Sequence, residues 1–356
     1  MKVFVHLARN KDANQWREAR TQGRLVGIND PTPYGYDRAE HMDCEVTFSA
    51  SDPENILIKF IRLSLRVILG FDIIHAWRQR SHIHKADIVW THTESQYLAV
   101  SALVLLLGWK VPILGQTVWL FDSWPRLNPL QRTLCRRLIK RIDLMTFLSP
   151  ENMAIAERLF PGKPKAFVKF GIPGEDLVEP VQRTAQPLKV LSVGNDRHRD
   201  WSTLVAATAD DPDVTLTILS GTANAALAKA PNVSIHSAKT NPELLRAYTD
   251  ASVVCVPLKP NHHASGITAA LEAVVRGAPL IITDIGGLRA YFSDDDVYFV
   301  PPGDPSALSA AIRHVMTHGE EALAKAKRVQ ERMRQGELGC QAYVAEHVRL
   351  SREILR

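Results

Sequence analysis

Short apolar runs alternate with helix-periodic segments through the second half of the chain. Several of the helix-periodic segments follow an Asp, Ser or Asn residue, types that cap helix N-termini. Such alternation is typical of βα units that build a parallel sheet, so this half is predicted to be a Rossmann-like domain. The predicted strands are 188–193, 214–219, 253–257, 279–282 and 297–300, and the predicted helices are 201–208, 242–249, 266–276 and 305–317.

The first half shows the same α/β alternation less regularly. Its predicted strands are 2–7, 88–91, 111–116, 144–148 and 166–169, with helices between them. No internal repeat of about 20 to 50 residues is visible, which excludes solenoids and propellers. Apolar periodicity lapses over 171–186, where we expect the domain boundary. The predicted division is an N-terminal domain over 1–172, a C-terminal domain over 173–338 and a final helix over 339–356 that returns toward the first domain.

Composition agrees with two globular domains. The 356 residues are 46% hydrophobic and 23% charged, which leaves no domain-sized segment with the signature of disorder. The four cysteines are far apart and form no CxxC pair, which argues against a zinc ribbon, a redox motif or a disulfide framework. A reducing cytoplasm is the expected location.

The chain has no segment that predicts secretion or membrane spanning. The opening MKVFVHLARN is too short for a secretory signal and is predicted to be a buried strand. The longest apolar stretch, 97–107, ends at Gly108 and falls short of the roughly 20 residues that a bilayer requires. A net charge of +5 favours phosphates, an anionic membrane or nucleic acid without choosing among them.

The first candidate loop follows the predicted strand 188–193 and runs from Gly194 and Asn195 to Arg199 and Trp201. In open α/β sheets, ligands bind outside the carboxyl ends of the strands. A glycine allows a ligand to approach the backbone, and an arginine fork suits diphosphate oxygens. Spacing from the glycine favours Arg199 over Arg197. A solvated polar turn is the alternative interpretation.

The second candidate loop, over 263–272, is the strongest signal. Small residues open directly into an apolar helix, where backbone N–H groups and the helix dipole favour phosphate. Glu272 lies on that apolar helix, where a partner such as a ribose hydroxyl would relieve the cost of burying it. A buried ion pair or an exposed helix face is the alternative. The loop enters the helix through Ser265, Gly266, Ile267 and Thr268.

With these residues assembled, the C-terminal half resembles the GT4-like family of retaining GT-B glycosyltransferases. The resemblance rests on 194–201 and on SGITAALEAVVRGAPLIITDIGG over 265–287, whose paired glycines Gly286 and Gly287 could line a sugar pocket or form only a turn. It covers about 170 residues well and the first half loosely. It implies two Rossmann-like domains facing a central cleft, a nucleotide-sugar donor held by the C-terminal domain, and transfer with retention.

The resemblance also implies which groups bind the donor and perform the chemistry. The positions that hold the diphosphate and the ribose in the family are matched by Ser265, Gly266, Ile267, Thr268 and Glu272. Arg199 and the helix N-terminus would stabilise the departing nucleoside diphosphate, so neither a cofactor nor a metal is expected. The sequence departs from the family where the first glutamate of the motif becomes Ala264, after His262 and His263. In the first half, Trp119 replaces a donor-contacting histidine. His92 and Asp122 are the candidate catalytic substitutes, and a UDP-sugar carrying a hexose is the expected donor.

Two helices of the first half carry basic residues among apolar ones. The residues Ser51-Asp52-Pro53-Glu54 predict a capping box that opens a helix through about 69, and a second basic helix is predicted over 129–141. Both could rest on anionic lipid at the inner face of the cytoplasmic membrane. The acceptor would then be lipid-linked, in a surface-polysaccharide or glycolipid pathway. Solvated outer faces of domain helices are an equal alternative.

Other functions remain as competing hypotheses. A nucleotide-sugar epimerase or hydrolase would use the same donor pocket, and a non-catalytic partner subunit would bind donor without turnover. A dehydrogenase is disfavoured because no GxGxxG follows a strand. His82, His84 and His92 lack the framework of a metal site, and the basic runs lack the aromatic platform of nucleic-acid binding.

Overall fold

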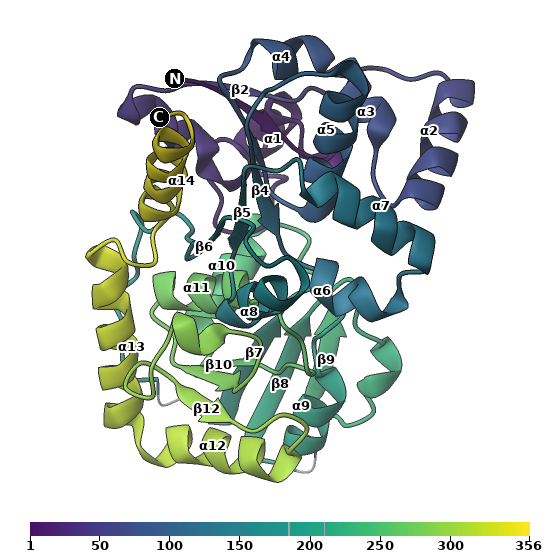
Figure 1. Ribbon diagram of the computed structural model, residues 1–356. Coiled ribbons are helices and arrows are strands. Elements are labelled where there is room, and N and C mark those ends of the chain that lie inside the picture. The colour runs from purple at the N-terminus through teal and green to yellow at the C-terminus, as the bar shows by residue number, and fades with distance from the viewer. Residues whose placement is uncertain (184–185, 210) are drawn as a thin grey trace. The chain divides into compact units, whose positions relative to one another are not determined.

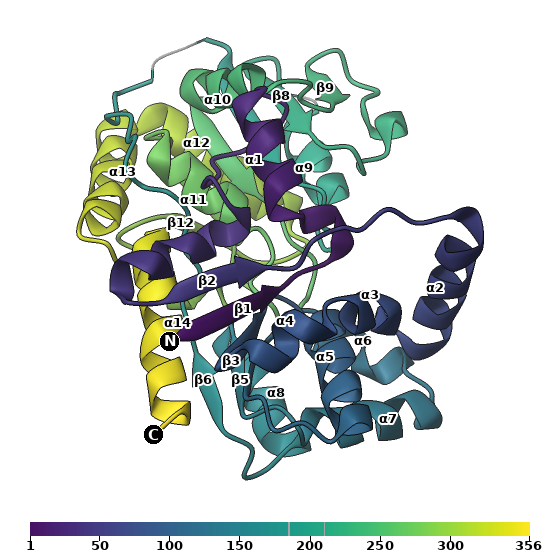
Figure 2. The same ribbon diagram turned by 90° about the horizontal axis from the view of Figure 1, so that it is seen from above.

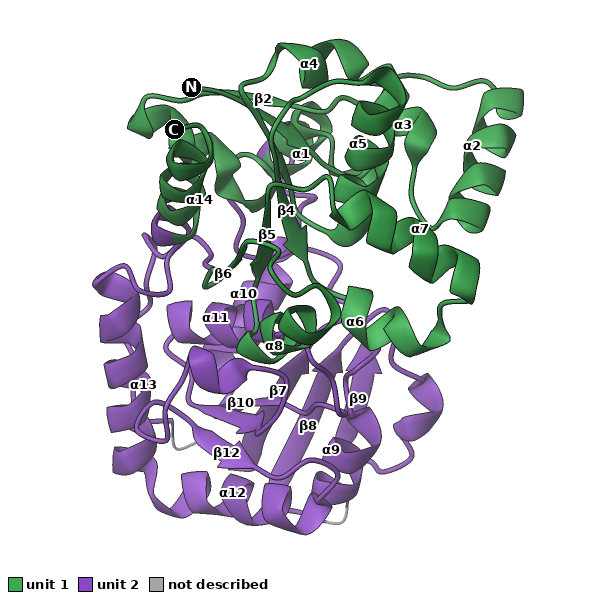
Figure 3. Ribbon diagram, viewed as in Figure 1, with its two compact units in different colours: residues 1–20, 31–169, 343–356 green, residues 21–30, 170–342 purple. Residues whose placement is uncertain are grey.

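The computed structural model describes residues 1–183, 186–209 and 211–356. The chain forms two compact units, which Figure 3 distinguishes by colour. Unit 1 contains residues 1–20, 31–169 and 343–356, and unit 2 contains residues 21–30 and 170–342. Residues 21–30 therefore belong to unit 2, although their position in the sequence placed them in the first half. Thr184 and Ala185, within the predicted boundary segment, lie outside the described residues.

Unit 1 is built on a parallel sheet of six strands in the order β2-β1-β3-β4-β5-β6. The central strands β3, β4 and β5 are buried along their whole length, as expected of a parallel sheet covered on both faces. The strands are β1 (Lys2–His6), β2 (Glu45–Phe48), β3 (Ile88–Thr91), β4 (Ile113–Thr117), β5 (Leu144–Phe147) and β6 (Lys165–Phe167).

The helices of unit 1 differ in how much apolar surface they bury. α5 is apolar around its circumference and is mostly buried against the sheet, whereas α2 stands at the outer edge of the unit beside α3 (Figure 1). The final helix packs on β3, where the Trp90 indole donates to Ser351 at 2.8 Å. These helices are α1 (Ala13–Thr21), α2 (Ile56–Leu69), α3 (Ile73–Arg78), α4 (Arg80–Lys85), α5 (Glu94–Leu107), α6 (Leu120–Ser123), α7 (Pro129–Ile139), α8 (Pro150–Leu159) and α14 (Cys340–Ile354).

Unit 2 contains a second parallel sheet of six strands, in the order β12-β11-β10-β7-β8-β9. The chain builds outward from β7 in one direction and then from β10 in the other, so the strand order reverses between β7 and β10. The strands are β7 (Leu188–Val193), β8 (Val214–Leu219), β9 (Val233–His236), β10 (Val253–Val256), β11 (Leu280–Thr283) and β12 (Tyr298–Val300). The helices are α9 (Trp201–Thr208), α10 (Asn241–Asp250), α11 (Ile267–Val275), α12 (Pro305–Thr317) and α13 (Gly319–Arg334).

Most predicted elements are confirmed, and two kinds of difference have physical reasons. The edge strands β2 and β9 were not predicted; Figure 2 shows β2 beside β1. Both are short and half-exposed, so neither carries a continuous apolar run. The capping box at Ser51 was wrong. α2 begins at Ile56, and the Asn55 side chain caps it by accepting the Ile58 N–H at 2.8 Å.

Candidate functional site

The candidate site in unit 2 lies at the carboxyl ends of β7 and β10. The strand order reverses between these two strands, and ligands of open α/β sheets bind at such a point. The loop after β7 carries Gly194 to Asp200, and the loop after β10 leads through His263 into the N-terminus of α11. The sheet therefore brings together two of the three loops that the sequence indicates.

Arg199 occupies the centre of this arrangement. Its side chain lies against two glycines, because a Cβ on Gly194 would be 2.5 Å from Nη2 and a Cβ on Gly266 would be 3.0 Å from Nη1. Both glycines have positive φ values, 145° and 83°. Any larger residue at either position would push the guanidinium away.

The Arg199 guanidinium is buried without an anionic partner. It is 4% exposed, and its Nε and Nη1 atoms have no hydrogen-bond partner. No carboxylate among the described residues lies within ion-pair distance of it. Burial accordingly lowers the pKa of Arg199 from its ordinary value. A buried charge left uncompensated costs several kcal/mol, so the site is suited to an anionic ligand.

The N-terminus of α11 supplies further groups for an anion. Gly266 caps the helix in the left-handed conformation, so the first-turn N–H groups and the positive end of the dipole point away from the helix. The Ser265 hydroxyl is buried and has no hydrogen-bond partner. Thr268 lies in the first turn, where its backbone rather than its side chain would contact a phosphate, whereas the Ile267 N–H already donates to the Ala264 carbonyl at 3.2 Å.

Glu272 has protein partners rather than an open carboxylate. It is 5% exposed and accepts hydrogen bonds from the Tyr248 hydroxyl at 2.8 Å and from the Ile28 N–H at 3.0 Å. Gly27 has a φ of 115°, and a Cβ there would lie 3.0 Å from Glu272 Oε1. Burial raises the pKa of Glu272, while these hydrogen bonds and Arg199 oppose that shift. Sequence reasoning missed Tyr248 and Ile28, which no local pattern connects to Glu272.

Asn195 and Asp196 hold the first loop in place. The Asn195 side-chain oxygen accepts the Gly221 N–H at 2.7 Å, which ties the loops after β7 and β8 together. Asp196 accepts from His198 and His263, each at 3.2 Å. Although burial raises the pKa of Asp196, the hydrogen bonds from these histidines lower it well below its usual range. The sequence did not identify Asp196.

Among the described residues, Asp196, His198 and His263 are the side chains that could together coordinate a metal cation. One ligand atom each from Asp196, His198 and His263 lies within 4.8 Å of the others. A carboxylate with two imidazoles suits a transition metal. However, both histidines form hydrogen bonds to Asp196, and these hydrogen bonds explain why the three side chains lie together without an ion.

The third loop, which follows β11 and carries Gly286 and Gly287, packs against the second candidate loop through Gly286. Gly286 and Gly287 have φ values of 71° and 75°, and a Cβ on Gly286 would lie 2.4 Å from Asn261 Oδ1. That oxygen is buried and has no hydrogen-bond partner. Asn261 is thus a further polar group near His263 that sequence reasoning missed.

The candidate catalytic residues of the first half both lie in unit 1. His92 follows β3 and is buried, with its Nδ1 atom 2.9 Å from the Tyr36 hydroxyl and its ring stacked on Tyr34. Burial lowers the pKa of His92 well below its ordinary value. Asp122 lies on the short helix α6, which follows β4, and the neighbouring Trp119 is 39% exposed.

Residues 195–318, which contain these unit 2 loops, match the family model described as "Glycosyl transferases group 1". The chain is a glycosyltransferase. None of the curated protein sequences matches it. This glycosyltransferase nevertheless shares its fold with solved structures across nearly its whole length.

A sucrose-phosphate synthase from Thermosynechococcus elongatus superposes with a TM-score of 0.75 at 17% identity, covering 99% of both chains. Anabaena HepE in complex with UDP and glucose gives a TM-score of 0.67 at 13% identity, covering 98% of this chain and 99% of that one. A Rickettsia africae glycosyltransferase gives 0.63 at 12% identity, covering 100% and 99%. These likenesses confirm the GT-B fold that the sequence predicted.

No helix in the described parts of this glycosyltransferase combines the length and apolarity needed to cross a bilayer.

Proposed function

We propose that this enzyme transfers a hexose from a UDP-sugar to a glycan or lipid-linked acceptor, with retention of configuration and without a metal. The buried, uncompensated guanidinium of Arg199 carries the proposal. The diphosphate of the donor would supply the missing anion, and the charge that develops on departing UDP would be stabilised by Arg199 and by the N-terminus of α11. HepE, which has the same fold, is solved with UDP and with UDP-glucose, which supports uracil as the base.

Thermal-shift titration with UDP, GDP and ADP tests the donor assignment. Ligand binding to the native state raises the unfolding temperature by mass action. UDP is expected to stabilise the wild-type chain most, and Arg199→Ala is expected to lose most of that stabilisation. Arg197→Ala is the matched control, because Arg197 lies in the same loop and is exposed.

Two outcomes of this titration contradict the proposal. If UDP still stabilises the Arg199→Ala variant, or if both variants lose the stabilisation equally, Arg199 does not bind the donor specifically. If no nucleotide raises the unfolding temperature at millimolar concentration, the assignment of a donor site is wrong.

The acceptor is proposed to be presented at the inner face of the cytoplasmic membrane, in a surface-polysaccharide or glycolipid pathway. α2 turns its apolar side outward, with Ile56 89% and Phe60 68% exposed, and Lys59 and Arg66 flank that side. Apolar insertion beside cations is the combination by which a helix binds anionic lipid. α7 presents the exposed side chains of Arg136, Arg137 and Leu130 as a second contact.

Sedimentation with lipid vesicles tests this placement. The chain is expected to sediment with phosphatidylglycerol vesicles and much less with phosphatidylcholine vesicles. Phe60→Ser is expected to weaken that binding, whereas Leu106→Ser, which changes an equally exposed leucine on α5, leaves it unchanged. If both variants lose vesicle binding equally, α2 is not a specific membrane contact.

A further inference from the structure

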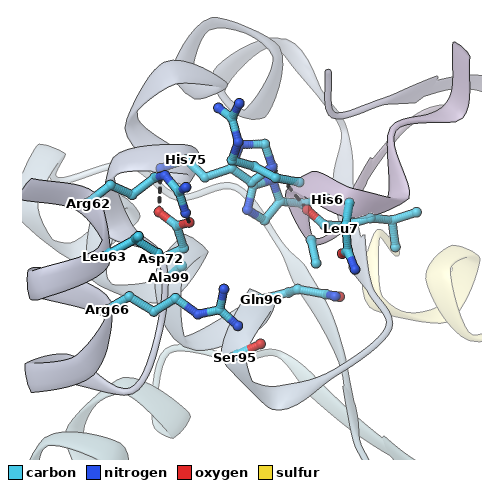
Figure 4. A pocket seen from close by; sticks show the side chains of 13 residues that line it. His6, Leu7, Arg62, Leu63, Arg66, Asp72, His75, Ser95, Gln96 and Ala99 are labelled. Atoms are coloured by element: carbon cyan, nitrogen blue, oxygen red, sulfur yellow. Dashed lines mark hydrogen bonds and ion pairs between the residues drawn. The ribbon is translucent and has the colours of Figure 1, made fainter. Parts of the chain in front are cut away.

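A cavity of about 310 Å³ lies in unit 1, at the carboxyl end of β1. Its walls come from the segment 6–10, from α2, from the start of α3 and from the first turns of α5 (Figure 4). The carboxyl end of a parallel strand is where α/β proteins bind ligands. All of its lining residues belong to unit 1.

Two arginines of α2 line this cavity in different states. Arg62 is buried and bound by carboxylates, with Nε 2.9 Å from Glu54 and Nη1 2.8 Å from Asp72. Arg66, one turn later, extends into the cavity toward Ser95 and Gln96 (Figure 4). Within the described residues, Arg66 makes no ion pair or hydrogen bond through its side chain. Arg66 is therefore available for an anion in the cavity.

Two buried histidines add unsatisfied polar atoms to the same cavity. His6 and His75 are each 2% exposed and their rings stack at 4.9 Å. The His75 Nε2–H donates to the Leu7 carbonyl at 3.0 Å, which leaves Nδ1 as an acceptor. The Nδ1 atoms of both histidines are buried without a partner. Buried polar atoms are nearly always hydrogen-bonded, so a ligand with a hydroxyl hydrogen fits here.

The first turns of α5 complete the polar wall. Ser95, Gln96 and Ala99 line the cavity, so the positive end of this 14-residue helix faces it. Together with Arg66, this end favours an anion, and the histidines favour a hydroxyl. A phosphate monoester carries both kinds of oxygen.

The cavity is continuous with the apolar side of α2 through Leu63. Leu63 lines the cavity and is also 41% exposed. Ile56, Phe60 and Val67 lie on the same side of the helix, and Val67 is 80% exposed. Apolar patches of this kind on soluble proteins mark sites of interaction. An anion-binding cavity that opens onto an apolar helix face matches an amphiphile with a phosphate head.

We infer that the acceptor is a lipid-linked phosphate, whose phosphate occupies this cavity and whose hydrocarbon chain lies along the exposed face of α2. This inference rests on the proposed glycosyltransferase function. It adds the acceptor's chemical class and assigns its recognition to Arg66, His6, His75 and the apolar residues of α2.

Isothermal titration of the full chain with butyl, hexyl and octyl phosphate tests the inference. The titrations use concentrations below micelle formation, with octyl glucoside and glucose 6-phosphate as comparison ligands. The variants are Arg66→Gln for the cavity and Phe60→Ser for the apolar face. Arg158→Gln on α8 and Leu106→Ser on α5 are the controls, each changing an exposed side chain of unit 1.

Octyl phosphate is expected to bind, and octyl glucoside to bind at least about tenfold more weakly. Arg66→Gln is expected to weaken octyl phosphate binding about tenfold, the effect of losing a charge-assisted hydrogen bond. Affinity of the wild-type chain should rise with alkyl length, toward the about fourfold per methylene that complete burial gives. Phe60→Ser should flatten that dependence while leaving butyl phosphate binding unchanged. Both controls should behave as the wild-type chain does.

If UDP binds, so that the proposed function stands, three results would still overturn the inference. Glucose 6-phosphate binding as tightly as octyl phosphate would make the ligand a water-soluble sugar phosphate. If no alkyl phosphate binds, the cavity is not an acceptor site. A dimer that Phe60→Ser dissociates, with no dependence on alkyl length, would make the apolar face an interface between copies. Absence of UDP binding would instead overturn the proposed function itself, and this inference with it.

Discussion

Arg62 in unit 1 and Arg199 in unit 2 are both buried arginines, but their surroundings differ. Arg62 is 8% exposed and is held between Glu54 and Asp72. Arg199 is 4% exposed and lies against two glycines, without a carboxylate at ion-pair distance among the described residues.

The difference changes the direction in which the pKa of each guanidinium is shifted. Burial alone would lower both pKa values. For Arg62, hydrogen bonds to Asp72 and Glu54 reverse the shift and raise the pKa, whereas for Arg199 burial prevails. Removing one partner of a buried ion pair is costly to the fold, whereas a buried arginine without a carboxylate is suited to binding an anionic ligand.

The largest expected effect comes from removing Arg199. Arg199→Ala is expected to lower kcat/KM for the UDP-sugar by about 10² to 10³, the usual loss when a preorganised group that stabilises developing charge is removed. The unfolding free energy should stay the same or rise, because an uncompensated charge leaves the interior. UDP release and urea unfolding measure the two effects. If the unfolding free energy of Arg199→Ala instead falls by several kcal/mol, Arg199 has a structural role like that of Arg62.

Removing the partner of Arg62 is expected to do the opposite. Glu54 also lies 3.1 Å from Arg9 and 3.3 Å from Arg78, so Glu54→Gln leaves several cations without compensation. The unfolding free energy should fall by about 3 kcal/mol, while stabilisation by UDP stays unchanged. Glu157→Gln is the control, because its pair with Lys165 is exposed at Glu157 and contributes less than about 1 kcal/mol. Equal losses would show that burial of the pair is irrelevant.

Glu272 is a third buried carboxyl or guanidinium group, and its hydrogen bonds come from the neutral Tyr248 hydroxyl and Ile28 N–H. Burial raises its pKa above the ordinary 4.5, so its contribution to stability is greatest below pH 4.5 and falls as pH rises through the raised value. Tyr248→Phe removes a hydrogen bond that opposes this shift. The variant's deficit in unfolding free energy should therefore grow with pH, from about 1 kcal/mol at pH 4 to about 2 kcal/mol at pH 7.

Urea unfolding at several pH values measures this deficit. Tyr291→Phe is the control, because the Tyr291 hydroxyl accepts the Phe170 N–H and its loss should not depend on pH in this range. A deficit for Tyr248→Phe that shrinks as pH rises would reverse the assigned sign.

The smallest expected effect is that of chelation. If Arg199 and α11 supply the positive charge for UDP, dialysis against EDTA leaves UDP release unchanged. Activity that falls in EDTA and returns with Mn²⁺ or Zn²⁺ would contradict this. Asp196→Asn would then identify the ligand set, because it would abolish the response if Asp196, His198 and His263 hold the ion.

The sequence predicted well the elements that carry a clear apolar pattern. β7, β8, α9 and α12 begin and end where their apolar patterns do. The edge strands β2 and β9 were missed because a half-exposed strand has a weak apolar pattern. The start of α2 was misplaced because Glu54 forms ion pairs with arginines rather than a capping box.

The candidate site was predictable only where it is local in sequence. Residues 265–272 form one loop and helix start, and Arg199 lies five residues after Gly194, so their chemistry could be recognised from spacing. The partners of Glu272 come from positions 248 and 28, and Asp196 meets His263 from 67 residues away. Folding alone brings such groups together, so no local pattern encodes them.

The assignment of residues 21–30 to unit 2 has a consequence for modularity. The chain passes between the units at 20/21, 30/31, 169/170 and 342/343, so unit 2 is not one continuous stretch. A chimera joined at residue 170 would inherit the residues of the motif but lose the Ile28 N–H that Glu272 accepts. Transplanting unit 2 intact into another chain would therefore require 21–30 together with 170–342.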